Sequence, residues 1–257
     1  MHYSRKIPLI ILLLFSGLTV LGQFDTEEID TLENKILYNK QITYGLTFHN
    51  LGFGANFRTG KRLTYFKTRM FEIEFFSMRS YKQVKMINPY FANSRRYVFG
   101  KYNEAFFLRC GMVWKKLLNQ KPYWGGVELR FMYGGGFSLG IAKPYYLYII
   151  EDVTGDGTNF ILVTERFDAG KHSSTYIYGR APFSTGLDEI TLHPGLYLKT
   201  GLNFEFGTRN TLVKSLEVGA AIDILPTGLN IMADDNNQIF FPGIFLNFSL
   251  GKRFNKY

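Results

Sequence analysis

The stretch from Val127 to Ile141, VELRFMYGGGFSLGI, alternates two kinds of side chain over about fifteen residues. Its odd positions carry apolar residues or glycine, whereas its even positions carry charged, small or flexible residues such as Glu128, Arg130 and Ser138. A period of two is the pattern of a β-strand whose two faces meet different environments. Strands in soluble domains usually have about five or six residues, and a tilted strand needs roughly nine to eleven to cross a bilayer. The stretch is therefore long enough to span a membrane.

The same alternation recurs along the chain, in 42–58, 71–75, 106–116, 196–206, 216–224 and 244–253. Within 42–58 the apolar positions change parity at His49-Asn50. Such a change indicates either a tight hairpin or one long strand with a bulge, because an extra residue exchanges the two faces. A hairpin gives eight strands, with both termini on the periplasmic side. One long strand makes the count odd unless 151–191 supplies another, and it leaves the side of the long loops open.

The pattern therefore predicts an all-β fold, an antiparallel transmembrane β-barrel of about eight strands with a polar lumen. Short turns are expected at 59–61, 117–124 and 208–214 on the periplasmic side, and long loops at 79–103, 151–191 and 226–237 outside. A soluble β-sandwich or lipocalin-like barrel has the same alternation with the faces exchanged. Two features favour the membrane barrel: the predicted inner faces carry mainly small residues and balanced charges, and the chain closes on an aromatic-rich end, Phe254 to Tyr257.

The N-terminal region has the features of a secretory signal peptide. Residues 1–22 carry Arg5 and Lys6, then an apolar run over 7–15, then small residues ahead of a cleavage position before Gln23. The run is short for a transmembrane helix, and no later stretch approaches the roughly eighteen consecutive apolar residues that such a helix needs. We expect export through the inner membrane with cleavage of 1–22, a polar lead-in over 23–40, and a barrel over 41–257 in the cell outer membrane.

Composition and charge narrow the class further. The chain is 46% hydrophobic and 17% aromatic, which suits strands and membrane interfaces. Loss of Arg5 and Lys6 with the signal lowers the formal net charge from +9 to +7, a balance that favours contact with anionic lipid or lipopolysaccharide. Cys110 is the single cysteine, so an internal disulfide is excluded, and it is too far from the cleavage position to carry a lipoprotein anchor.

The inward-facing positions carry a balanced set of charges. An eight-stranded barrel has an interior that side chains fill, which argues against a general diffusion pore. Burying these charges unpaired would cost several kcal/mol each, so we expect them to neutralise one another as an ion-pair network. The predicted set is Glu72, Glu74, Arg109, Lys115, Glu128, Arg130, Lys199, Glu205, Glu217, Asp223 and Arg253.

The loop from Arg79 to Asn103 is basic and aromatic and contains no carboxylate. Cations interleaved with rings suit nucleic acid in a cytosolic protein, but an exported chain excludes that partner. We therefore predict binding of outer-membrane lipid and lipopolysaccharide phosphates or of another outer-membrane protein; the alternative is a solvated loop with tyrosines at the membrane interface. The candidate residues are Arg79, Lys82, Lys85, Tyr90, Arg95, Arg96 and Lys101.

Three weaker signals favour ordinary structure over chemistry. Glu151 to Asn159 places oxygen ligands around glycines, but it lacks a complete calcium loop and reads as a turn. The glycines at 134–136 lie inside a strand with no helix behind them, so they suit close packing across the lumen and not a phosphate cradle. His172 with Asp168, Ser173 and Ser174 could serve a lipid-modifying enzyme, but no spacing identifies a nucleophile and its base. We expect no cofactor, metal or catalytic residue.

Several short blocks carry a resemblance to a known group. They are Asn88-Pro89-Tyr90, Gly100-Lys101-Tyr102-Asn103, Lys143-Pro144-Tyr145-Tyr146, Tyr178-Gly179-Arg180-Ala181-Pro182-Phe183 and Pro194-Gly195-Leu196-Tyr197. At these blocks the chain resembles a family of outer-membrane β-barrel proteins from Bacteroidetes-type bacteria. The resemblance implies the location and the fold, and it brings no catalytic residues.

The same resemblance implies a role, because such bacteria rely on multi-subunit outer-membrane machines for protein secretion, barrel assembly and uptake. We therefore expect an accessory or structural subunit of an outer-membrane complex. The alternatives are a lipid-modifying enzyme and a small-solute conduit. Prolines beside aromatic residues stiffen loops 79–103 and 151–191, so we expect these two loops to pack together and face a partner.

Overall fold

A computed structural model describes residues 38–91, 93–120, 126–152, 159–168, 170–206, 211–233 and 237–255. These residues fall within one compact unit, Ile36–Tyr257. The predicted signal peptide, 1–22, and the lead-in up to residue 37 lie outside the described residues. So do the central residues 153–158 of the candidate calcium turn.

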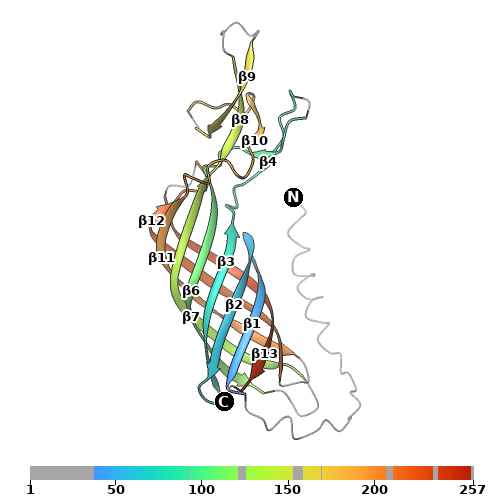
Figure 1. Cartoon of the computed structure of the whole chain (residues 1–257), viewed down its shortest axis with the longest axis vertical. Helices are drawn as coiled ribbons and strands as arrows, with labels where there is room; N and C mark the ends of the chain where they lie inside the picture. Colours follow the sequence, from blue (N-terminus) through green and yellow to red (C-terminus); the bar gives the residue numbers. More distant parts are fainter. Residues whose placement is uncertain are drawn as a thin grey trace, which may run out of the picture. The chain divides into compact units, whose positions relative to one another are not determined.

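Eight of the described strands close into an antiparallel barrel in the order β1-β13-β12-β11-β7-β6-β3-β2, as Figure 1 shows. The prediction of an eight-stranded barrel is therefore confirmed. The strands are β1 (Lys40–His49), β2 (Gly52–Arg62), β3 (Lys67–Met78), β6 (Asn103–Asn119), β7 (Glu128–Pro144), β11 (Thr191–Phe206), β12 (Leu212–Leu229) and β13 (Gln238–Phe254).

A tight hairpin joins β1 to β2, which settles the ambiguity at the parity change. His49 is paired with Gly52, and the amide of Asn50 donates to the carbonyl of Ile244 on β13 at 3.0 Å. The predicted turn at 59–61 is wrong, because these residues continue β2 and the chain turns at 63–66. Gly60 misled the prediction: a Cβ there would lie 2.3 Å from the carbonyl oxygen of Arg69, so this glycine allows close approach between strands.

The two faces of the barrel wall are opposite in character. Outward side chains are apolar and exposed, for example Leu46, Leu198 and Ile244 at 60%, 60% and 64%. Inward side chains include charged groups that are fully buried, such as Glu72 and Glu217. A soluble barrel has the reverse arrangement, so this wall is built to face lipid. Within the described ranges, no helix is long and apolar enough to cross a membrane.

An apolar plug fills the end of the barrel at which β3 and β12 finish. The prediction that every inner face is polar or small is wrong there. Neighbouring residues such as Phe75 and Phe76 are both apolar, so alternation does not reveal which one faces inward; Phe76 does, and it is fully buried. The apolar plug consists of Phe76, Met78, Val98, Ala105, Phe107, Ala142, Leu225, Leu229, Ile231, Met232 and Phe241.

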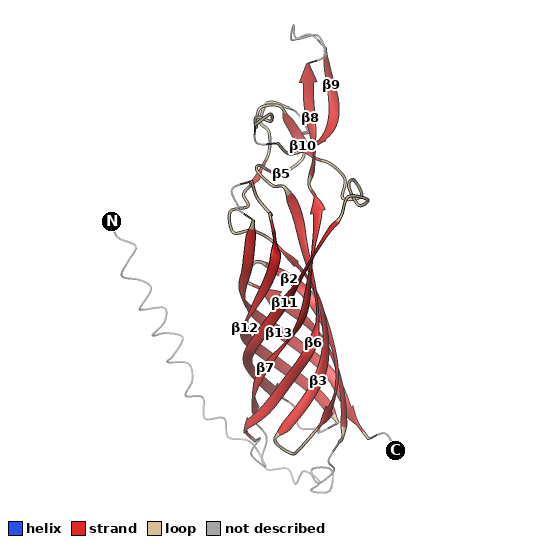
Figure 2. Ribbon diagram, turned by 90° about the vertical axis from the view of Figure 1, so that its left-hand side faces the viewer, coloured by secondary structure: helices blue, strands red, loops and turns tan. Residues whose placement is uncertain are grey.

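The two longest loops fold together beyond this plug, and we call residues 79–102 and 145–190 the loop head. It contains a sheet in the order β10-β8-β9, from Ile177–Arg180, Tyr146–Asp152 and Phe160–Arg166 (Figure 2). It also contains a short ladder of β4 (Lys85–Met86) with β5 (Tyr97–Val98). The Asn88 side-chain amide joins the loops by donating to the carbonyls of Thr175 and Ile177, each at 2.8 Å. The loops thus pack against each other.

Candidate functional site

Glu217 of β12 is the centre of the first group of buried charges. Its carboxylate accepts from Arg58 Nη1 and from Lys115 Nζ, each at 2.6 Å. The amides of Asn203 and Asn247 donate to the same carboxylate at 2.9 and 2.8 Å. All five side chains are buried, and the neutral amides complete the hydrogen bonding of an anion held between two cations.

A second group is centred on Arg109 of β6. Its guanidinium contacts Asp223 through two nitrogens, at 2.9 and 2.5 Å, and Glu74 through a third at 3.1 Å. Lys199 Nζ lies 3.0 Å from oxygens of both Glu72 and Glu74. Arg58 also pairs with Glu72 at 2.8 Å, and so joins this group to the first. We call the eight charged residues of these two groups the charged lumen.

Three cations of the charged lumen form ion pairs that cross the barrel. Arg58 on β2 reaches β12, Arg109 on β6 reaches β12, and Lys199 on β11 reaches β3. In the closed strand order each of these pairs of strands is separated by three positions around the barrel. Side chains that meet from nearly opposite walls occupy the space between them, as the width of an eight-stranded barrel leads one to expect.

The remaining predicted lumen residues pair nearer the turns at the other end of the barrel. Arg253 Nη2 lies 2.5 Å from Glu205, and Arg130 pairs with Glu128. The structure therefore brings every member of the predicted set into an ion pair. Sequence reasoning missed Arg58, which is fully buried, because it took the strand to end there. Its parity, shared with Asn56 on the inner face, was the available signal.

The glycines of β7 and β6 let the wall and the lumen pack closely. A Cβ at Gly136 would lie 2.5 Å from the Cα of Gly111 on the neighbouring strand, and a Cβ at Gly111 would lie 2.6 Å from the hydroxyl of Tyr197. Tyr197 is buried in the lumen, where its ring lies 5.5 Å from the Arg109 guanidinium. Small residues on β6 and β7 thus make room for a ring from β11, the strand paired with β7, whereas the sequence predicted bulk from across the lumen.

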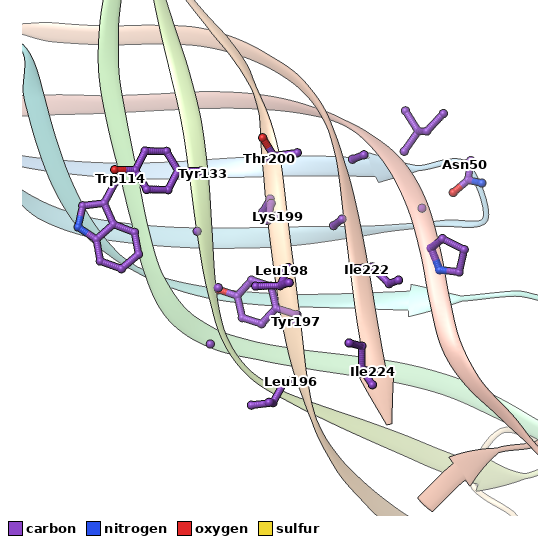
Figure 3. Close-up of a pocket in the computed structure, with 18 residues that line it drawn as sticks. Asn50, Trp114, Tyr133, Leu196, Tyr197, Leu198, Lys199, Thr200, Ile222 and Ile224 are labelled. Atoms are coloured by element: carbon purple, nitrogen blue, oxygen red, sulfur yellow. The ribbon is translucent and has the colours of Figure 1, made fainter. Parts of the chain in front are cut away.

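An apolar groove runs along the outer face of the same wall (Figure 3). Its volume is about 1110 Å³. Its floor includes Gly135, Thr200 and Ala220, which are small for outward positions, and Leu198 and Ile222 rise beside them. At one side Trp114 and Tyr133 stack with ring centroids 5.8 Å apart. The groove therefore belongs to the outward, apolar face of the wall.

A second cavity, of about 680 Å³, opens at the junction of the barrel and the loop head. We call it the basic mouth, because its lining includes five cationic side chains and one carboxylate, Glu104. The cations are Arg79, Lys85, Arg96, Lys101 and Arg180.

Four of the seven loop residues predicted to bind an anion or a partner line the basic mouth, namely Arg79, Lys85, Arg96 and Lys101. The other three lie elsewhere on the loop head. Tyr90 is 75% exposed, Lys82 lies over the Tyr81 ring at 5.9 Å, and Arg95 packs beside Gly179. Arg180 was missed, because only the folding of the loop head brings β10 to residues some eighty positions earlier.

His172 belongs to a small hydrogen-bonded turn. Its Nδ1 accepts from the Asp168 amide at 3.0 Å, and its Nε2 lies 3.1 Å from Glu165. Lys171 donates to Glu165 and, together with His172, lowers the pKa of that carboxyl. The hydroxyl of Ser173 contacts Thr175, and in the described parts of the loops no serine hydroxyl bonds to the imidazole. The structure does not bring His172 and the serines together as a nucleophile and base, and the described residues contain no cluster of three metal-ligating side chains.

No protein-family model matches the chain, and no curated protein matches it. Among solved structures it is similar to the Neisserial surface protein NspA, with 11% identity and a TM-score of 0.38 over 84% of this chain and 97% of that one. It is also similar to Ail, the attachment invasion locus protein of Yersinia pestis, with 9% identity and a TM-score of 0.40 over 85% of this chain and 100% of that one. The strand order and the inverted burial of the wall define the fold as an eight-stranded antiparallel transmembrane β-barrel.

Proposed function

We propose that the mature chain lies in the outer membrane, after export with cleavage of residues 1–22, and acts there as a docking or accessory subunit of a membrane complex. Support for the membrane comes from the exposed apolar side chains of the wall, which would be costly in water. Support for the role comes from what the barrel does with its interior and with its loops.

The interior offers little to a conduit. Arg58, Arg109 and Lys199 each cross the lumen to a carboxylate on a distant strand. The apolar plug occupies the next level toward the loop head. A barrel that is filled by charged side chains at one level and by the apolar plug at the next is better suited to act as a scaffold than as a channel for solutes.

The observation that carries the proposal is the ribbon formed by β8 and β9. Their pairing continues over Ile150 to Asp152 on β8, beyond Ile149, the last residue of β8 that pairs with β10. On the paired part of β9, Phe160, Ile161 and Leu162 are consecutive and are 57%, 50% and 52% exposed. Consecutive exposed apolar residues on an open strand edge favour association with another protein chain.

The partner that fits this ribbon is a protein segment that adds to the β9 edge. Backbone amides and carbonyls of an edge strand supply hydrogen bonds to such a segment, and pockets between alternate side chains supply selectivity. Phe160 and Leu162 lie on one face of the ribbon, so their removal would weaken that contact while the barrel strands remain unchanged.

A pull-down from membranes solubilised in mild detergent tests the proposal. The tagged wild-type chain is compared with Phe160→Ser/Leu162→Ser and with a matched control, Leu63→Ser/Phe66→Ser, which removes two exposed apolar side chains at the β2–β3 turn. We expect stoichiometric partners with the wild type and the control, and loss of those partners with the ribbon variant. A lone wild-type monomer would refute the proposal, and altered lipid A in an overexpressing strain would favour a lipid-modifying enzyme.

A further inference from the structure

The basic mouth is assembled from segments that are distant in the sequence. Arg79 follows β3, Lys85 belongs to β4, Arg96 precedes β5 and Lys101 precedes β6. Arg180, the last residue of β10, completes the set. Folding of the loop head therefore concentrates five cations around one cavity, and their mutual repulsion must be offset for this arrangement to be stable.

The protein itself offsets only part of this charge. Glu104, the single carboxylate in the lining, lies 2.9 Å from Arg180 and 3.6 Å from Lys101. Within the described ranges, Arg79, Lys85 and Arg96 form no ion pair with a carboxylate. Burial lowers the pKa of Lys101, and the charges of Arg180 and Arg79 lower it further against the opposing effect of Glu104. An anion in the cavity would relieve this excess of positive charge.

The rim of the cavity connects it to the outer surface of the barrel. Phe48 and Phe53, on either side of the β1–β2 hairpin, are part of the lining. They are also 50% and 59% exposed on the outward, apolar face of the wall. A molecule that fills the cavity with an anionic group can therefore lay apolar chains along the barrel from the same position.

We infer that the basic mouth binds the phosphate group of an anionic lipid in the leaflet that surrounds this end of the barrel, with its acyl chains against Phe48 and Phe53. Arg79 and Arg96 suit this chemistry, because a guanidinium donates two parallel hydrogen bonds to a phosphate and stays charged at any physiological pH. The ring pair at the rim distinguishes a lipid from a free phosphate ion, which has no apolar part.

Native mass spectrometry of the mature chain in detergent tests the inference with three probes: diphosphorylated lipid A, the same lipid after removal of its phosphates, and inorganic phosphate as a competitor. The site variant is Arg79→Gln/Arg96→Gln. The matched control is Arg69→Gln/Lys116→Gln, which removes two exposed cations from the ends of β3 and β6 that lie farther from the basic mouth. A difference in electrophoretic mobility between unheated and boiled samples (heat-modifiable mobility) shows that each variant retains a folded barrel.

We expect the wild type and the control to bind diphosphorylated lipid A, and the site variant to bind it roughly tenfold more weakly, since each cation near such a surface contributes several-fold to binding. Removal of the lipid phosphates should weaken binding to the wild type by a similar factor. Equal binding by the site variant and the wild type would overturn the inference. Displacement of the lipid by millimolar inorganic phosphate would overturn its lipid part and assign the cavity to a free phosphate ion.

Discussion

The charged lumen and the apolar plug fill the same barrel by opposite means. In the charged lumen, each carboxylate pairs with specific cationic side chains at 2.5 to 3.1 Å, so the burial of each charge depends on particular partners. In the apolar plug, residues such as Leu225 and Phe107 fill volume without directional bonds. The boundary is shared, because the Arg109 guanidinium lies 4.2 Å from the centre of the Phe76 ring. A membrane barrel can thus seal its interior either by pairing charges or by packing volume.

Removal of Glu217 should cause the largest loss of stability, because it takes away the carboxylate shared by two buried cations, Lys115 and Arg58, of which Arg58 keeps Glu72 as a partner. We expect Glu217→Ala to lower the free energy of unfolding by about 3 to 5 kcal/mol, the range for breaking a buried ion pair on one side. Urea unfolding in lipid vesicles, followed by tryptophan fluorescence, measures the change. A loss below about 1 kcal/mol would show that water or a neighbouring carboxylate takes the place of Glu217.

Replacement of Glu217 together with its two cationic partners sharpens the comparison between charge pairing and apolar packing. We expect Arg58→Met/Lys115→Met/Glu217→Met to be more stable than Glu217→Ala, because apolar residues of similar volume replace buried charges with little net cost. Glu72 then keeps Lys199 as its partner. The same urea experiment ranks the two variants. If the triple variant proves the less stable of the two, the charged lumen does more than fill space, and its directional bonds fix the strand register.

Truncation of a side chain in the apolar plug should lower the free energy of unfolding by less than removal of Glu217. The loss should depend only on the side-chain volume that is removed. Leu225 packs closely against two glycines, since a Cβ at Gly140 or Gly195 would lie 2.8 or 2.6 Å from its methyl groups. We expect Leu225→Ala to cost about 2 to 3 kcal/mol, toward the lower end of the range for Leu→Ala, and Leu225→Met to cost less than about 1.5 kcal/mol. An equal loss in both variants would mean that shape, and not volume, holds the plug together.

The substitution Asn88→Ala should lower the stability of the loop head and leave the stability of the barrel unchanged. Asn88 binds backbone carbonyls of the other loop, so we expect a local loss of about 1 to 3 kcal/mol that leaves the urea midpoint of the barrel unchanged. Limited proteolysis should then cleave 79–102 and 145–190 faster than in the wild type. The control Asn39→Ala alters an exposed residue before β1. A lowered urea midpoint would show that loop head and barrel unfold as one unit.

Alkaline pH should have the smallest effect, confined to the loop head. Burial raises the pKa of Tyr97 and of Tyr145, whose hydroxyl accepts from the Val98 amide at 3.2 Å. Because the folded-state pKa is raised, the stabilisation is complete below the unfolded value of about 10 and is lost as the pH rises through the folded value. Near-UV circular dichroism should change at high pH, and less so in Tyr145→Phe. An identical profile in that variant would place the titration elsewhere.

Strand positions and faces could be predicted because a lipid-facing wall forces a period of two. Glu72, Glu74 and Arg109 were assigned to the lumen by parity alone. Arg58 was lost because Gly60, followed by a lysine, resembles a turn, and only the neighbouring strand shows that this glycine allows close approach. The apolar plug was missed where both neighbours are apolar, as at Phe75 and Phe76, because such a pair carries no information about its faces.

The basic mouth shows a different limit of sequence reasoning. The composition of 79–103 indicated an anion site, and four of its cations do line one cavity. Arg180 could not be assigned to it, since its position depends on how β10 pairs with β8 and on the contact between the two loops. Long-range packing of irregular loops leaves no periodic signal in the chain.

Conductance of the purified wild-type protein in planar lipid bilayers tests most directly whether side chains seal the lumen. The ion pairs across the charged lumen and the apolar plug predict no discrete conductance steps over the baseline, under conditions in which a known pore of similar preparation conducts. Insertion is verified independently by protease protection of the barrel strands. Stable, reproducible single-channel steps from the inserted wild type would contradict the sealed barrel and favour a small-solute conduit.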